Sequence, residues 1–171
     1  MEAFWQRVLQ HQQASGFSDI AGAHASVVLP VSDRLVSRLV AERASPDWPV
    51  SVVEVRAEAA DRFVVSLRLK GPTFLPLLRV RFEIERQPEL PSSPVLVLRI
   101  VPDALTAVAT PFLRFLKRLP EGVGFDGSRL TLHLWTILSG SGIPDEVRQR
   151  LTSLAIHAEE GRFVLQADAQ V

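Results

Sequence analysis

The sequence predicts an α+β fold in which an antiparallel, curved β-sheet embraces one or two helices. Two observations lead to this class: alternating apolar and polar residues recur along the chain, and apolar pairs at helical spacing occur between the alternating stretches. The clearest alternation lies within residues 76–86, where four apolar side chains alternate with charged ones: Leu78, Val80, Phe82 and Ile84 against Arg79, Arg81, Glu83 and Glu85. A period of two gives a strand one apolar face and one charged face.

Length and composition indicate one globular domain. The chain has 171 residues, of which 47% are hydrophobic and 22% are charged, so it can bury a substantial core. We expect a single α+β domain over residues 1–171, with residues 1–16 as an N-terminal helical extension. The 19 basic and 19 acidic residues balance, which argues against attraction of the whole chain to nucleic acid or to an anionic membrane and leaves only a local charged patch for such contacts. We expect no nucleic acid partner.

The chain contains no cysteine, which excludes disulfides, thiolate nucleophiles and thiolate metal ligands. Its first residues lack the basic start and the apolar core of a signal peptide. No apolar run approaches the roughly 18 residues that a membrane span requires. We therefore expect a soluble, cytoplasmic protein.

Apolar spacing places the elements of the first half. A short amphipathic helix over residues 2–13 gathers on one side Phe4, Trp5, Val8 and Leu9. A strand over residues 23–29 is followed by Ser32, a good N-cap for a helix that ends near Ala44. Four strands are then expected over residues 50–59, 62–70, 76–86 and 94–101. Because the connections are too short for parallel crossovers, these strands should form an antiparallel meander.

The second half mixes helices and strands. A second helix begins at Asp103, and Pro111 within it should cause a kink. The pair Asp126-Gly127 indicates a tight hairpin before an alternating strand over residues 130–134. A short third helix opens at Pro144, and a turn joins two final strands around residues 154–158 and 163–167.

No residue pattern indicates catalysis or metal binding. Gly140-Ser141-Gly142 lacks the five-residue pattern of a nucleophile elbow, and the chain has no Gly-rich phosphate loop. No helical metal-ligand spacing occurs among the histidines, which are His11, His24, His133 and His157. We therefore expect no enzyme activity, no cofactor and no metal site. A buried His133 or His157 beside a carboxylate would reopen the question of an enzyme.

The connection at residues 71–78 is unusual, because hairpin loops are normally polar. It carries the apolar residues Phe74, Leu75 and Leu77 between the basic residues Arg68, Lys70, Arg79 and Arg81. An apolar tip with a basic collar suits an anionic lipid surface, since the tip would enter the acyl region while Arg79 and Arg81 contact headgroups. The alternative is that the loop folds back and caps the core.

Three segments of the chain resemble the tubular lipid-binding superfamily, particularly its small bacterial single-module members. They are residues 25–32 running into the first long helix, residues 119–123 followed by 127–134, and residues 160–165. The resemblance implies a curved antiparallel β-sheet wrapped around one long helix, with additional short helices. It also implies an apolar groove for acyl chains, and binding or carriage of lipid without catalysis.

We expect non-catalytic binding or carriage of a lipid, or of another apolar small molecule, in a groove between sheet and helix. The expected groove residues are Leu35, Leu39, Phe82, Val97, Phe112 and Phe115. Close packing without a groove is the alternative. The chain would then be a structural or interaction module with a dry core, which binds a protein partner through the apolar loop or through Phe4 and Trp5 of the N-terminal helix. An unpaired sheet edge would also allow dimerisation.

Overall fold

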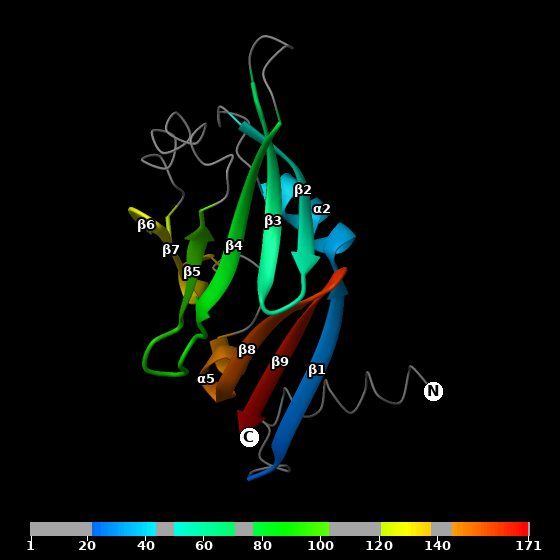
Figure 1. Ribbon diagram of the computed structural model, residues 1–171. Helices are drawn as coiled ribbons and strands as arrows, with labels where there is room; N and C mark the ends of the chain where they lie inside the picture. Colours follow the sequence, from blue (N-terminus) through cyan, green and yellow to red (C-terminus); the bar gives the residue numbers. More distant parts are fainter. Residues whose placement is uncertain (1–21, 44–49, 71–76, 103–120, 138–144, 171) are drawn as a thin grey trace.

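The computed structural model describes residues 22–43, 50–70, 77–102, 121–137 and 145–170. Within these ranges it contains nine strands and three helices (Figure 1). The strands are β1 (His24–Ser32), β2 (Val50–Glu58), β3 (Arg62–Leu69), β4 (Leu78–Arg86), β5 (Val95–Val101), β6 (Val123–Asp126), β7 (Arg129–His133), β8 (Leu151–Glu159) and β9 (Arg162–Gln170). The helices are α2 (Asp33–Arg43), α4 (Leu134–Ile137) and α5 (Asp145–Arg150).

The strands form two antiparallel sheets. The larger sheet has the order β2-β3-β4-β5-β7-β6, and the smaller sheet has the order β1-β9-β8. In Figure 1 the smaller sheet lies below the larger one, next to the turn that joins β2 to β3. The strand β1 pairs with β9, with Val27 opposite Ala167, so the smaller sheet joins the two ends of the described chain.

The expected arrangement of one curved sheet wrapped around one long helix is wrong. The described residues form two sheets, and α2, with 11 residues, is their only helix longer than six residues. This helix lies against β2, at an edge of the larger sheet (Figure 1). The helix expected from Asp103 lies outside the described residues. Apolar periodicity identifies strands but not their distant partners, so it could not reveal the non-local pairing of β1 with β9.

Several local predictions are confirmed. The helix α2 begins directly after the predicted cap, and the Leu35 N–H donates to Ser32 Oγ at 3.3 Å. The strands β2 to β5 are antiparallel neighbours in chain order, as a meander requires. The predicted hairpin at Asp126-Gly127 joins β6 to β7. Gly127 has a φ of 60°, which glycine adopts without steric penalty.

One apolar core spans both sheets. Phe63 of β3 stacks on Phe82 of β4 with ring centroids 5.4 Å apart, and it meets Phe163 of β9 edge-on at 5.6 Å. The smaller sheet therefore contributes directly to the core of the larger one. The buried cluster comprises Val55, Ala57, Phe63, Leu67, Leu78, Val80, Phe82, Leu96, Leu98, Leu134, Ala158 and Phe163.

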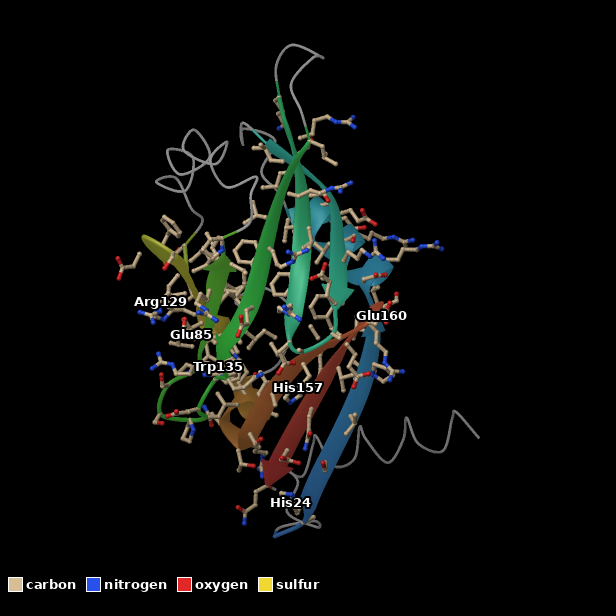
Figure 2. All side chains as sticks on the ribbon, in the orientation of Figure 1. His24, Glu85, Arg129, Trp135, His157 and Glu160 are labelled. Atoms are coloured by element: carbon tan, nitrogen blue, oxygen red, sulfur yellow. The ribbon has the colours of Figure 1, made fainter. Side chains whose placement is uncertain are left out.

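Side chains from the larger sheet's connections close the free edge of β8. The Gln87 amide donates to the Ile156 carbonyl at 2.7 Å and accepts from the Ile156 N–H at 2.9 Å. The Ala158 N–H donates to the Asp61 carboxylate at 3.0 Å, and the Asp61 N–H donates to the Ala158 carbonyl at 3.2 Å. These bonds satisfy backbone groups that would otherwise be unpaired, and they join the two sheets near His157 (Figure 2).

Candidate functional site

The larger sheet buries one face in the core and presents the other face, here called the charged face, on its outer side. Cross-strand register arranges charged residues of this face in rows. One row crosses all six strands and consists of Glu58, Arg62, Glu83, Arg99, Arg129 and Asp126. Charges of opposite sign are neighbours along most of this row, which therefore forms a ladder of compensating charges.

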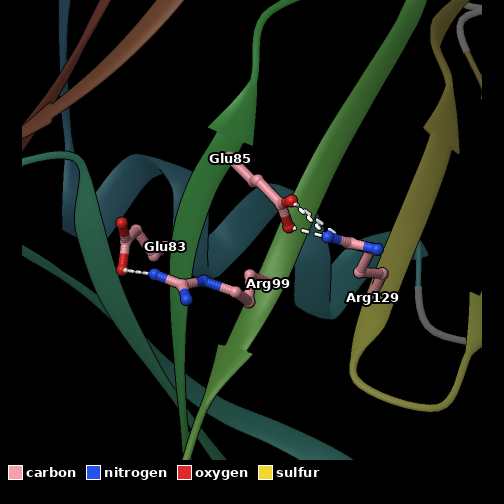
Figure 3. Close-up of polar contacts among 4 residues, drawn as sticks. All are labelled: Glu83, Glu85, Arg99 and Arg129. Carbon is pink, nitrogen blue, oxygen red and sulfur yellow. Dashed lines mark hydrogen bonds and ion pairs between the residues drawn. The ribbon is translucent and has the colours of Figure 1, made fainter.

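The base half of the charged face, defined as the end nearest the β2–β3 turn, is neutral. Arg99 lies 2.9 Å from Glu83, and Arg129 binds both carboxylate oxygens of Glu85, the shortest distance being 2.7 Å (Figure 3). A β-bulge in β4 contributes Glu85 as its extra residue. Four arginines and four acids give this half zero net charge: Arg62, Arg86, Arg99 and Arg129 against Glu58, Glu83, Glu85 and Asp126.

The contact between Glu85 and Arg129 changes the pKa of both groups. The hydrogen bond from Arg129 lowers the pKa of Glu85 below its usual value, and the same bond raises the pKa of Arg129. Both groups therefore stay charged near neutral pH and satisfy each other. The base half consequently has little free charge to offer an external ion.

The opposite end of the charged face, here called the tip half, carries surplus positive charge. The paired residues of β2, β3 and β4 in this half include four arginines, Arg56, Arg68, Arg79 and Arg81, and one acid, Glu54, so their net charge is +3. Of these arginines, Arg81 bonds to Glu58 at 3.0 Å. The other three are exposed, and their guanidinium groups form no hydrogen bond or ion pair in the part of the chain that the structure describes.

Three adjacent strands hold these arginines in register. Arg68 on β3 is opposite Ser51, Arg79 on β4 is opposite Ser66, and Arg56 on β2 shares a row with Arg81. Neighbouring strands are about 4.8 Å apart. The tip half therefore presents an array of cations that suits several phosphate or carboxylate groups at once, rather than one buried ion.

The residues predicted to contact headgroups, Arg79 and Arg81, both lie in the tip half. Phe74 and Leu75, predicted to enter a membrane, lie outside the described residues. Leu77, at the same end of β4, is exposed. Sequence spacing did not suggest Arg56 as a neighbour of the predicted pair, because only the pairing of β2 with β3 brings it to this place.

The predicted groove residues do not gather at one place within the described ranges. Phe82 is buried in the core, whereas Val97, also buried, lies at a register position on the opposite face of the sheet. Phe82 and Val97 therefore do not line the same side. Leu35 and Leu39 are exposed on α2. Two further positions, Phe112 and Phe115, lie outside the described residues.

The closest approach of a histidine to an acid within the described ranges is that of His157 to Asp61. The distance from His157 Nδ1 to Asp61 Oδ1 is 3.2 Å, and both side chains are partly exposed rather than buried. The same carboxylate accepts the Ala158 N–H, so it already holds the two sheets together. No group of three or more His, Asp or Glu side chains in the described part of the chain could hold a metal ion. We interpret the His157–Asp61 pair as a structural contact.

Sequence reasoning missed the exposed apolar side chains of the first two described elements. Six large apolar residues are exposed there: Val27, Val28 and Leu29 on β1, and Leu35, Leu39 and Val40 on α2. A signal was available, since residues 25–31 contain no charged residue and a strand there is apolar on both sides. Exposed apolar patches commonly mark contacts with another surface.

Comparisons with known proteins found no family model, no curated protein and no solved structure that matches this chain. The resemblance to the tubular lipid-binding superfamily therefore stays a prediction. None of the helices in the described ranges is long and apolar enough to cross a membrane.

Proposed function

We propose that this protein is a non-catalytic module that binds anionic lipid surfaces through the tip half of its charged face. The proposal rests on the difference in charge pairing between the two halves of that face. The base half has as many acids as arginines, whereas Arg56, Arg68 and Arg79 are exposed without an acidic partner among the described residues. Each basic residue near an anionic membrane contributes about 1 kcal/mol to binding.

Apolar residues at the same end favour a lipid surface over other polyanions. Leu77 is exposed there, and the preceding connection contains Phe74 and Leu75. Aliphatic side chains gain from contact with acyl chains, whereas a phosphate backbone in water offers them little.

The proposal includes a cytoplasmic location and a peripheral contact with the membrane, because the cytoplasmic leaflet carries the anionic lipids that attract basic segments. In its stronger form the module also carries a lipid or another apolar molecule. Native mass spectrometry of the purified protein tests this form, since a carried lipid adds a defined mass that an organic extract of the same sample identifies.

Co-sedimentation with vesicles tests the surface contact. Phosphatidylcholine vesicles with phosphatidylserine should bind the protein, vesicles without it should not, and added salt should weaken binding. The double variant Phe74→Ser, Leu75→Ser should fold normally and bind anionic vesicles less tightly. Binding that ignores phosphatidylserine, or no binding to either vesicle, would contradict the proposal and favour a protein partner.

A further inference from the structure

The smaller sheet has an apolar face that continues the core outward. On this face Val27, Leu29 and Val31 of β1 are in register with Ala167, Leu165 and Phe163 of β9. Phe163 is buried in the core, whereas Leu29 and Val27, toward the start of β1, are 52% and 57% exposed. The main contacts of β1 within the described ranges are with β9 and α2. The outer part of an apolar sheet face is therefore left open to water.

The edge of β1 is a poor template for a second copy of the chain. The Asp33 N–H donates to the Gly161 carbonyl at 3.4 Å, which continues the β1–β9 register. Because hydrogen-bonded positions alternate along an antiparallel strand, the odd-numbered residues of β1 direct their N–H and C=O groups toward β9, and the even-numbered residues direct theirs away from the sheet. Pro30 is therefore an outward position without an N–H, and edge-to-edge pairing would lose a ladder bond there. The face of the sheet, rather than its edge, needs a partner.

The N-terminal segment of the same chain has a residue pattern and a length that would allow it to cover this apolar face. Residues 1–21 lie outside the described residues and lead into Gly22, two positions before β1. Residues 2–13 have the amphipathic helical pattern given by Phe4, Trp5, Val8 and Leu9. The eight residues 14–21 can span up to about 28 Å. That reach exceeds the roughly 23 Å of extended chain between Gly22 and Leu29, so the helix can return along β1.

We propose that residues 2–13 dock as an amphipathic helix on the apolar face of the smaller sheet and cover Val27 and Leu29. The short tether gives the segment an effective concentration in the millimolar range, which no separate partner has. Docking removes apolar side chains of both surfaces from water. The inference is independent of the proposed lipid binding, because the tip half of the charged face belongs to the other sheet.

Thiol labelling of the full chain tests the docking, and the absence of natural cysteine makes each introduced thiol unique. The variant Leu29→Cys reports on the apolar face. Its neighbour Val28→Cys, on the opposite face, is a matched control because the two positions are 52% and 60% exposed in the described structure. We expect a maleimide to label Leu29→Cys about tenfold more slowly than Val28→Cys, since labelling requires local opening.

Variants of the N-terminal segment identify what covers the face. Phe4→Ser with Val8→Ser should raise the labelling rate of Leu29→Cys to that of Val28→Cys. Gln6→Ser with Gln10→Ser, on the polar side of the same helix, should leave it slow. Equal rates in the chain with an unchanged N-terminus would overturn the proposal. If Leu29→Cys is still labelled slowly in the variant Phe4→Ser with Val8→Ser, the proposal is also overturned. A labelling rate that depends on protein concentration would then identify a second copy of the chain as the partner that covers the face.

Discussion

Removal of the three unpaired arginines of the tip half should abolish most of the vesicle binding. The variant Arg56→Gln, Arg68→Gln, Arg79→Gln deletes exposed charges that make no ion pair within the described ranges, so folding should be little affected. At about 1 kcal/mol for each arginine near an anionic surface, the loss is about 3 kcal/mol. Because 1.4 kcal/mol corresponds to a factor of ten, the partition coefficient should fall about 100-fold.

A matched control removes three arginines from the base half of the same face. The variant Arg62→Gln, Arg99→Gln, Arg129→Gln changes the net charge of the chain by the same amount, from 0 to −3. Arg62 and Arg68 are six positions apart on β3, which is about 20 Å. That distance is about twice the screening length at physiological salt, so the control should bind within about threefold of the unchanged protein.

The assay is sedimentation with phosphatidylserine-containing vesicles at physiological salt, with far-ultraviolet circular dichroism to verify folding of both variants. Equal losses in the two variants would refute the reasoning, because net charge alone would then explain binding. Unchanged binding of the tip-half variant would refute it as well, since the unpaired arginines would then have no part in the contact.

Three further predictions concern stability, measured by urea unfolding. Gln87→Ala removes two hydrogen bonds to the edge of β8 and should lower the free energy of unfolding by about 1–3 kcal/mol. Phe163→Ala removes the aromatic contact between the sheets and should cost about 3–5 kcal/mol, whereas exposed Gln166→Ala should be nearly neutral. Arg129 lowers the pKa of Glu85, so the contribution of Glu85 to stability is present above its unfolded-state pKa and is lost as pH falls through its folded-state pKa. The variant Glu85→Gln should therefore lose less free energy of unfolding than the unchanged protein when the pH is lowered through this range. An equal loss in both proteins would contradict this prediction.

Local chemistry explains which parts of the fold could be predicted from the sequence. Ser32 could be identified as a helix cap because its partner, the Leu35 N–H, is three residues away. The alternation within residues 76–86 defines a strand and its charged side without reference to any other strand, and β4 occupies this stretch. Both features depend on neighbours in the sequence, and both predictions are confirmed.

Long-range pairing explains what could not be predicted. The strands β1 and β9 lie at opposite ends of the described chain, and no periodicity indicates that they form one ladder. Val97 and Phe82 are apolar residues of two predicted strands, and only the register shows that they occupy opposite faces of the sheet. Arg79 and Arg81 follow from alternation, whereas Arg56 joins them only through the β2–β3 register.

The surplus charge of the tip half opposes folding slightly, because like charges on neighbouring strands repel each other. The base half shows that this sheet can place a carboxylate beside an arginine, as it does at Glu85 and Arg129. In the tip half, Ser66 rather than an acid is the cross-strand neighbour of Arg79. An external anion would relieve this repulsion, and a ligand that binds only the folded state stabilises it. Anionic vesicles should therefore raise the Tm of the unchanged protein but not that of the variant Arg56→Gln, Arg68→Gln, Arg79→Gln, and an equal rise in both, measured by scanning calorimetry, would show that the arginines are not the binding groups.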